Sequence, residues 1–275
     1  MSLTIAVANQ KGGVGKTATA VNLGASLALS GCRVLVVDMD SQGSATSGLG
    51  LARTPGSSSY EVLIGALSAA SAIRPTSIEG LSLIPATRDL AGAEVELISS
   101  DDRHARLRDQ LEPIRPGFDY ILIDCPPALG MLTLNALCAA DAVVVPLQCE
   151  FYALEGLGAL VETLERVRAA FRPELRILGI LLTMYDSRTS LSRQVATEVR
   201  KHFGDKVLHA MIPRNVRISE SPSHGQPVVT YDPSSSGAAA YRQAAREILQ
   251  LTKDAAPSGP ARETKTEDDD ATAAG

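Results

Sequence analysis

The chain has no tryptophan, few other aromatic residues and no long hydrophobic run. Aromatic residues make up 4% of its 275 residues. No stretch approaches the roughly 18 uninterrupted apolar residues of a spanning helix, so the sequence predicts no stable membrane insertion. The N-terminus lacks the basic segment of a secretory leader and enters an apolar pattern at once, so we expect no signal peptide.

Cysteine is also scarce. Cysteines stand at four positions, Cys32, Cys125, Cys138 and Cys149, and no two of them form a CxxC pair. Because they lie in apolar stretches, buried free thiols are favoured over zinc ligands or disulfides. We therefore expect a reducing, cytoplasmic location.

Basic residues are fewer than acidic ones, with 26 Lys and Arg against 31 Asp and Glu, and the resulting formal net charge of −5 is unevenly distributed along the chain. Residues 253–275 hold six acidic and three basic side chains, so this segment contributes −3 and the rest of the chain −2. A nearly neutral body gives no overall attraction for nucleic acid, which would need a local basic patch. The composition predicts one folded domain at 1–252, followed by a disordered acidic tail at 253–275.

Short runs rich in Val, Ile and Leu alternate with segments of helical spacing. The runs expected to be strands are 3–8, 33–38, 81–85, 120–124, 142–147, 177–184 and 207–212. The expected helices are 16–29, 103–111, 132–139, 154–171, 191–203 and 238–251, and 52–59 is expected to be a surface loop. This alternation predicts an α/β fold with a doubly wound, mostly parallel sheet flanked by helices.

A glycine-rich segment follows the first strand directly and precedes a helix. Residues 10–17 read QKGGVGKT, a variant of the phosphate-binding pattern GxxxxGK[ST] in which Gln10 replaces the first glycine. Lys16 would bridge the β- and γ-phosphates of a nucleotide and Thr17 would ligate Mg²⁺. An ordinary glycine turn is the alternative, but the strand before it and the helix after it favour the phosphate loop. The expected loop contacts are Lys11, Gly12, Gly13, Val14, Gly15, Lys16, Thr17 and Ala18.

Aspartates follow two of the predicted strands. Asp38 and Asp40 end or follow the second strand, and Asp124 ends the fourth. Each could simply cap the next helix. Because carboxyl ends of parallel strands meet at one sheet edge, we instead expect these carboxylates beside the loop, with Asp124 as an outer ligand of the metal.

Five ordered motifs resemble the ParA/Soj partition ATPases, within the deviant Walker A group of P-loop NTPases that also holds MinD. They are ANQKGGVGKT at 8–17, VDMDSQGSATSGLG at 37–50, DYILIDCPPALGMLTLNAL at 119–137, LLTMYDSRTSLSRQV at 181–195 and IPRNVRISESPSHGQPV at 212–228. The similarity runs from about residue 4 to residue 251. The resemblance thus identifies 1–252 as a ParA-type ATPase domain.

The resemblance implies an ATP-dependent sandwich homodimer that hydrolyses ATP slowly. Lys11 would reach the partner subunit's phosphates, a role like that of an arginine finger supplied in trans. Gly12 would lie where the subunits approach, and Asp40 would position the attacking water while Asp38 supports the metal. Pro213 and Asn215 would contact the base, although the same residues also suit a plain turn. A ParB-like centromere-binding protein would stimulate turnover.

The resemblance further implies nonspecific DNA binding by the ATP dimer, and hence a nucleoid-associated ATP state. The matching basic residues are Arg188 and Arg217, and Arg193 and Arg200 would add to the patch from one helix face. The alternative is that these arginines only keep exposed helix faces solvated and bind no DNA. Ala18, Ser234 and Ser236 depart from the family pattern, and the two serines replace residues that are often basic in relatives.

Three other functions share this scaffold. A MinD-like membrane-associated ATPase would need a basic amphipathic C-terminal helix, whereas the predicted helix 238–251 is alanine-rich and the tail is acidic. A metabolic enzyme, such as a carboxylate activator or a nitrogenase-like electron donor, would need a substrate pocket or cluster cysteines that the sequence does not show. A ParA-like ATPase that positions a protein cargo stays open.

Overall fold

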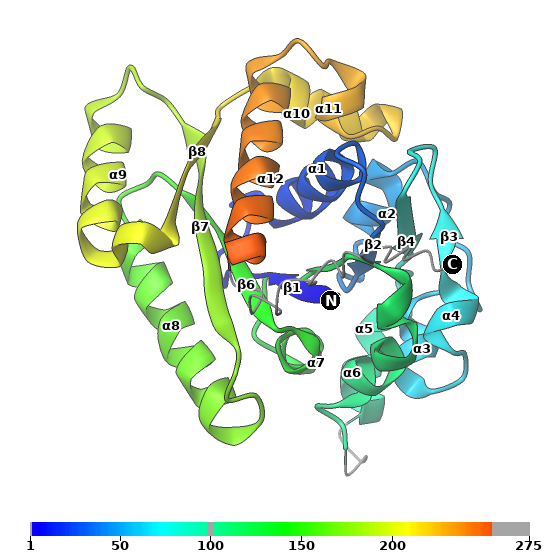
Figure 1. Cartoon of the computed structure of the whole chain (residues 1–275). Helices are drawn as coiled ribbons and strands as arrows, with labels where there is room; N and C mark the ends of the chain where they lie inside the picture. The colour runs from blue at the N-terminus through cyan, green and yellow to red at the C-terminus, as the bar shows by residue number, and fades with distance from the viewer. Residues whose placement is uncertain (1, 98–101, 255–275) are drawn as a thin grey trace, which may run out of the picture.

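The computed structural model describes residues 2–97 and 102–254, in which eight strands form one sheet in the order β3-β4-β2-β5-β1-β6-β7-β8 (Figure 1). Every neighbouring pair is parallel except β3 with β4. The strands are β1 (Leu3–Val7), β2 (Val34–Asp38), β3 (Arg74–Pro75), β4 (Leu81–Ile84), β5 (Tyr120–Asp124), β6 (Ala142–Gln148), β7 (Arg176–Tyr185) and β8 (Val207–Pro213). The predicted doubly wound, mostly parallel sheet is therefore confirmed.

Helices connect the strands and cover both faces of the sheet (Figure 1). The longer ones are α1 (Lys16–Ala28), α7 (Met131–Ala139), α8 (Ala153–Ala170), α9 (Ser190–Phe203) and α12 (Ser236–Asp254). The shorter ones are α2 (Ser44–Gly48), α3 (Ser59–Ile64), α4 (Ala69–Ala72), α5 (Leu90–Glu96), α6 (Arg106–Leu111), α10 (Val216–Glu220) and α11 (Val228–Tyr231), with 3₁₀ turns η2 (Glu112–Gly117), η3 (Gly204–Lys206) and η4 (Ser221–His224).

All seven predicted strands are present within two residues of their expected bounds, and β3 was missed. The six predicted helices correspond to α1, α6, α7, α8, α9 and α12. The loop expected at 52–59 ends one residue early, because Ser58 caps α3 in a capping box with Glu61. Helix α12 extends to Asp254, so the predicted domain boundary at 252 falls two residues early, and the rest of the predicted tail lies outside the described residues.

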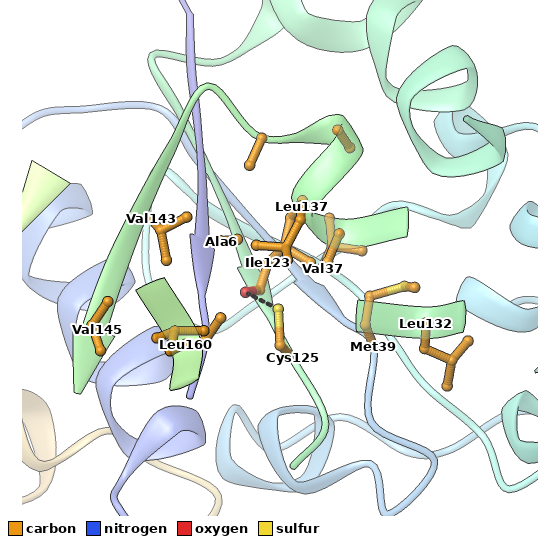
Figure 2. Packing of buried hydrophobic residues seen from close by; sticks show 14 of the residues in the cluster. Ala6, Val37, Met39, Ile123, Cys125, Leu132, Leu137, Val143, Val145 and Leu160 are labelled. Carbon is orange, nitrogen blue, oxygen red and sulfur yellow. Dashed lines mark hydrogen bonds between the residues drawn. The ribbon is translucent and has the colours of Figure 1, made fainter. Parts of the chain in front are cut away.

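Alternating strand residues build two apolar cores on opposite faces of the sheet. In β2, Leu35 and Val37 point into one core and Val34 and Val36 into the other. Figure 2 shows the first core, in which Leu132 and Leu137 of α7 and Leu160 of α8 pack on the strands. The second core is covered by α1, α2, α11 and α12. Burial on both faces explains why the strands read as continuous apolar runs.

Helix α12 uses its apolar side in the second core. Ala238, Tyr241, Ala245 and Ile248 are buried there, and the helix packs along α1 (Figure 1). No helix in the described part of the chain is long and apolar enough to cross a membrane.

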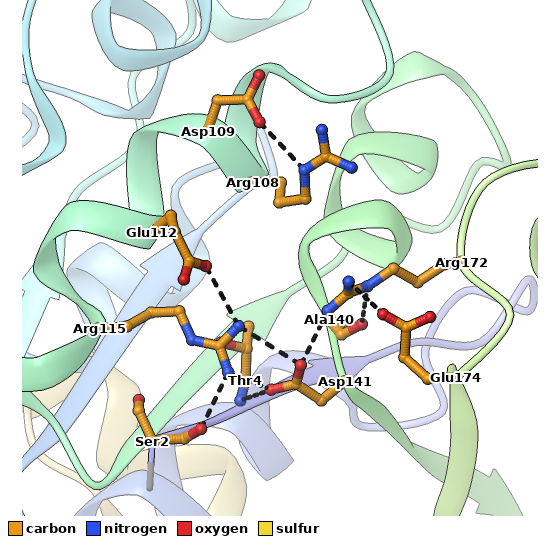
Figure 3. A network of polar contacts seen from close by, with 10 residues as sticks. All are labelled: Ser2, Thr4, Arg108, Asp109, Glu112, Arg115, Ala140, Asp141, Arg172 and Glu174. Carbon is orange, nitrogen blue, oxygen red and sulfur yellow. Dashed lines mark hydrogen bonds and ion pairs between the residues drawn. The ribbon is translucent and has the colours of Figure 1, made fainter.

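A polar network ties the amino-terminal ends of β1 and β6 together, opposite the carboxyl edge (Figure 3). Asp141 accepts hydrogen bonds from the Thr4 backbone at 2.8 Å, from Arg115 at 2.7 Å and from Arg172 at 2.9 Å. All three charged side chains are at most 20% exposed. The carboxylate is thus surrounded by donors, as a partly buried charge requires.

Candidate phosphate-binding site

The glycine-rich loop lies at the carboxyl edge of the sheet, between the end of β1 and the start of α1. Gly13 and Gly15 have left-handed backbones with φ of 75° and 90°. A Cβ added to Gly12 or Gly13 would meet no atom within 4 Å, so open space lies over the loop. The loop is anchored from behind, since Thr183 Oγ1 donates to the Val14 carbonyl at 2.8 Å. Such a loop in front of a helix N-terminus is suited to bind phosphate.

The two lysines of the loop have different environments. Lys16 is buried, and its Nζ donates to the Lys11 carbonyl at 3.1 Å. Burial lowers the pKa of Lys16, while Asp124 and Asp40 nearby oppose this shift. Lys11 is about 40% exposed and forms an ion pair with Glu150, the second residue after β6. In this conformation Lys11 contacts its own subunit.

Two aspartates are neighbours in the sheet register, with Asp38 beside Asp124 on β2 and β5. Both are fully buried. Both carboxylate oxygens of Asp124 have no hydrogen-bond partner among the described residues. Burial, together with the charge of Asp38, raises the pKa of Asp124 well above its usual range, although the nearby Thr17 hydroxyl opposes this shift. A buried carboxylate that has only one hydroxyl nearby and no well-formed hydrogen bond among the described residues is suited to act through a cation or a bound water.

Asp38 is, in contrast, surrounded by donors. Its Oδ2 accepts from the backbone and hydroxyl of Thr46 at 2.8 and 2.7 Å, and its Oδ1 accepts from the Asp40 backbone at 3.2 Å. Burial raises the pKa of Asp38 to about 6, although the hydrogen bonds from Thr46 and Asp40 oppose this shift. Asp40 is half-buried, and its Oδ1 accepts from the Gln42 backbone at 2.9 Å.

Two pockets adjoin the loop, and both contact Gly15 and Ala18. The first, of about 430 Å³, contains Lys16, Thr17 and Asp40. The second, of about 370 Å³, contains Pro213 and Asn215 at the end of β8. The predicted phosphate residues and the predicted base residues thus line two pockets that share Gly15 and Ala18 at the start of α1.

Asn215 already has hydrogen-bond partners. Its side-chain oxygen accepts from the Arg217 backbone at 2.8 Å and so caps α10, and its nitrogen donates to Ser236 at 2.8 Å. One amide hydrogen and one lone pair are left for a ligand.

The four predicted DNA-binding arginines come from α9, α10 and the loop before α9. Arg188 is 86% exposed and pairs with Asp186 at 2.8 Å, and this contact lowers the pKa of Asp186 to about 2. Arg193 is exposed and donates to the Ser187 carbonyl, so it lies beside Arg188. Arg217 pairs with Glu220 at 2.9 Å and with Asp232 at 3.3 Å. Arg200 differs from these three, because it is half-buried and donates to the Leu208 carbonyl of β8 at 3.3 Å.

Three residues around the loop were missed from the sequence. Asn9 accepts from the Lys11 backbone at 3.0 Å and donates to the Pro146 carbonyl at 2.7 Å. Asn side chains often hydrogen-bond to the backbone two residues further on, and this preference could have indicated Asn9. Glu150 follows β6 at the carboxyl edge of the sheet, so the strand-end rule that predicted the aspartates could also have predicted Glu150. For Thr183, inside β7, the sequence carries no signal.

The prediction of buried free thiols is confirmed for three of the four cysteines. Cys125, Cys138 and Cys149 are buried and free, whereas Cys32 is half-buried. Burial raises the pKa of Cys149 to about 11, so this thiol is not a nucleophile at neutral pH.

Comparisons with known proteins agree with this site. Residues 2–177 match a family model described as an AAA domain. The chain is 55% identical over 253 residues to the chromosome partitioning protein ParA of Caulobacter vibrioides, covering 91% of this chain and 95% of that protein. It is 53% identical over 249 residues to the sporulation initiation inhibitor protein Soj of Bacillus subtilis, covering 90% of this chain and 98% of that one.

A solved structure is also similar. It is described as cobyrinic acid a,c-diamide synthase from Mycobacterium smegmatis with bound ATP analogue and magnesium, and it superimposes with a TM-score of 0.81 at 42% identity. The alignment covers 92% of this chain and 96% of that one. From the matched family model, the two curated relatives and the loop at the carboxyl edge, we conclude that the chain belongs to the ParA/Soj family of chromosome-partitioning ATPases.

Proposed function

We propose that this chain is an ATP-driven DNA-partitioning switch. In this proposal it binds MgATP, forms a sandwich homodimer, binds DNA nonspecifically as that dimer and is released after hydrolysis. A ParB-like centromere-binding protein stimulates the slow intrinsic hydrolysis, and the ATP state is nucleoid-associated. The observation that carries the proposal is the loop with two lysines in different environments, placed beside the unpartnered carboxylate of Asp124.

The residues present fit MgATP. The open space over Gly12 and Gly13 admits phosphate oxygens. Within the described residues, buried Lys16 donates to one acceptor, the Lys11 carbonyl, which leaves N–H groups for the β- and γ-phosphates. The described residues contain no cluster of three or more His, Cys, Asp or Glu that could hold a metal ion. Mg²⁺ usually takes one or two carboxylates, waters and substrate phosphates, so Thr17 and Asp124 suffice on the protein side. Bound Mg²⁺ neutralises charge on the phosphate oxygens.

Hydrolysis needs a water molecule in line with the γ-phosphorus. It also needs cationic groups that stabilise the negative charge on the phosphate oxygens. Asp40 lines the same pocket as Lys16 and Thr17, which supports the proposal that its carboxylate orients that water. Asp38 has its oxygens engaged by Thr46 and Asp40, which suits a residue that holds the metal side of the site in place. Lys16 acts on the phosphates of its own subunit, and Lys11 on those of the partner.

The surface around the loop favours dimerisation. Phe151 and Tyr152 follow Glu150, are 77% and 65% exposed, and contact each other edge to face. Leu129, on the loop after β5, is 44% exposed. Large apolar side chains exposed at one edge commonly mark an interaction surface. Burying them in a dimer would bring Gly12 and Lys11 to the partner's phosphates.

DNA binding would use Arg188, Arg193 and Arg217, which are exposed near the ends of β7 and β8. In the described residues, the guanidinium groups of these arginines contact nearby carboxylates or a carbonyl oxygen. Exposed ion pairs contribute little free energy, so DNA phosphate oxygens can replace these contacts with little loss of stability. Arg200 contributes less in this proposal, since its guanidinium already binds β8. Ser236 binds Asn215, so one of the two departures from the family pattern has a structural role.

Two rival functions receive less support. A MinD-like membrane association needs an exposed apolar helix face, and α12 has its apolar side in the core. The M. smegmatis structure is described as a diamide synthase, a metabolic enzyme, but the two partition relatives are more similar in sequence. Positioning of a protein cargo shares every step except the cargo itself.

The dimer step can be tested by light scattering with the Asp40→Ala protein. This variant should bind MgATP without hydrolysing it. Its measured molar mass should therefore be that of a dimer with MgATP and that of a monomer with MgADP. Gly12→Val is the matched control, because its side chain would stand between the subunits and should keep the protein monomeric with either nucleotide. A mass that is the same with both nucleotides in the Asp40→Ala protein would contradict the proposed switch.

A further inference from the structure

We propose that Thr46 is a positioning residue for ATP hydrolysis, which it affects by fixing the Asp38–Asp40 segment against the end of β4. The inference rests on the proposed role of Asp40. Thr46 lies in α2, which begins four residues after Asp40, and is fully buried. No motif argument from the sequence assigns it a role.

The side chain of Thr46 joins three parts of the fold. Its hydroxyl donates to Asp38 Oδ2 at 2.7 Å and accepts from the Ala86 backbone, after β4, at 2.9 Å. Its own backbone N–H donates to the same Asp38 oxygen at 2.8 Å. The hydroxyl therefore acts as donor and acceptor at once and connects the ends of β2 and β4.

Asp38 passes this constraint to Asp40. The other carboxylate oxygen, Oδ1, accepts from the Asp40 backbone at 3.2 Å, a longer and weaker bond than those from Thr46. If Thr46 loses its hydroxyl, Asp38 keeps one donor on Oδ2 and can rotate about its side-chain bonds. The Asp40 backbone then loses its fixed acceptor. A shift of the catalytic carboxylate by about 1 Å is enough to slow a reaction strongly.

The buried position makes this connection hard to replace. Helix α2 has five residues, too few to be stable without tertiary contacts. No described hydrogen bond other than that to Thr46 Oγ1 holds the Ala86 N–H, and water does not reach either residue. Thr46 is therefore placed to affect the rate of hydrolysis without contacting nucleotide, since it does not line either pocket beside the loop.

The test compares Thr46→Val, which keeps the shape of the side chain, with Thr46→Ser, which restores the hydroxyl. In single-turnover hydrolysis of radiolabelled MgATP, Thr46→Val should be about tenfold slower, while its affinity for a fluorescent ATP analogue changes less than about twofold. Thr46→Ser should recover the wild-type rate within about twofold. A residue that only stabilises the fold would lower the melting temperature in Thr46→Val but leave the rate per folded molecule unchanged.

Thr76→Val is the matched control. Thr76 donates to Leu81 at 2.8 Å and accepts from Ile78 at 3.1 Å, near the opposite end of β4. The Thr76→Val variant also loses one hydrogen bond that the hydroxyl donates and one that it accepts, but it should keep the wild-type hydrolysis rate. If Thr46→Val does not fold, Thr46→Cys replaces the hydroxyl by a weak hydrogen-bonding thiol and should slow hydrolysis in the same direction. A wild-type rate in the folded Thr46 variant overturns the inference, whereas absence of hydrolysis in the wild type contradicts the proposed function itself.

Discussion

Lys11 is paired with Glu150 of its own subunit, through Nζ and a carboxylate oxygen. Glu150 also accepts a hydrogen bond from Gln148 at the end of β6. Since the proposed role of Lys11 is to reach the partner's phosphates, the lysine must leave Glu150 when the dimer forms. The ion pair therefore opposes dimerisation.

Glu150→Gln should shift the equilibrium towards the ATP dimer. Side chains about 40% exposed on both sides form weak ion pairs of about 0.2–1 kcal/mol. Because each dimer breaks two such pairs, one in each subunit, the dimer dissociation constant should fall by up to about thirtyfold. Sedimentation equilibrium in the Asp40→Ala background measures it directly. A weaker dimer in Glu150→Gln would mean that Glu150 supports the interface and does not restrain Lys11.

The two lysines should separate nucleotide binding from hydrolysis. Lys16→Ala removes the buried cation at the phosphates, so binding of a fluorescent ATP analogue should be lost. Lys11→Ala should keep binding by the monomer within about threefold but lose hydrolysis, since its cation acts in the partner. Isothermal titration and phosphate release distinguish the two. Equal loss of nucleotide affinity in both variants would contradict a role of Lys11 in trans.

The buried aspartates predict a pH-dependent stability in the absence of Mg²⁺ and nucleotide. Their pKa values are raised, that of Asp38 to about 6, so the folded protein binds more protons than the unfolded chain between about pH 4 and 6. The contribution of these groups to the free energy of unfolding is therefore largest at low pH and is lost as pH rises through the folded pKa.

Asp124→Asn removes one of these charges and provides the comparison. The melting temperature of this variant relative to wild type should rise by several degrees as the pH increases above the ordinary aspartate pKa of about 4, and MgATP should abolish the trend in the wild type. A difference that stays constant with pH would show that the Asp124 carboxylate is not the source.

The Asp141 network predicts a large loss of stability far from the site. Asp141→Ala leaves Arg115 and Arg172 without their shared carboxylate and should lower the free energy of unfolding by about 3 kcal/mol (Figure 3). Chemical denaturation measures it, with Arg33→Ala as a control because the Arg33–Asp119 pair is exposed. Hydrolysis per folded molecule should not change in either variant.

The exposed arginines should affect DNA but not dimerisation. Arg188→Glu or Arg217→Glu should remove DNA binding by the ATP dimer, because each places a negative charge where phosphate would bind. Arg200→Ala should weaken DNA binding much less, since Arg200 contacts β8. Filter binding with the dimeric Asp40→Ala protein gives all three values. An Arg200 effect as large as that of Arg188 would contradict the minor role of Arg200 and show that the α9 helix face contacts DNA as well as the loop before it.

Much of the fold followed from the sequence because the strands are buried on both faces, which makes them continuous apolar runs such as Val34–Asp38. The loop and its aspartates followed from strand ends. Strand β3 and the short helices α2, α3, α4, α5, α10 and α11 did not, because a two-residue strand and helices of four to seven residues carry too little periodicity to be seen in the sequence and depend on tertiary contacts. The contacts of Glu150 and Thr46 also escaped, since both depend on which strand ends lie side by side.

The proposed switch requires DNA binding that depends on the bound nucleotide, and titration of a random-sequence duplex with the Asp40→Ala protein measures this dependence. The titration is done with MgATP or MgADP at two salt concentrations. We expect binding with MgATP only, and a steep loss of affinity at the higher salt because phosphate contacts release counterions. Absence of binding with MgATP, or equal binding with MgADP, would contradict it.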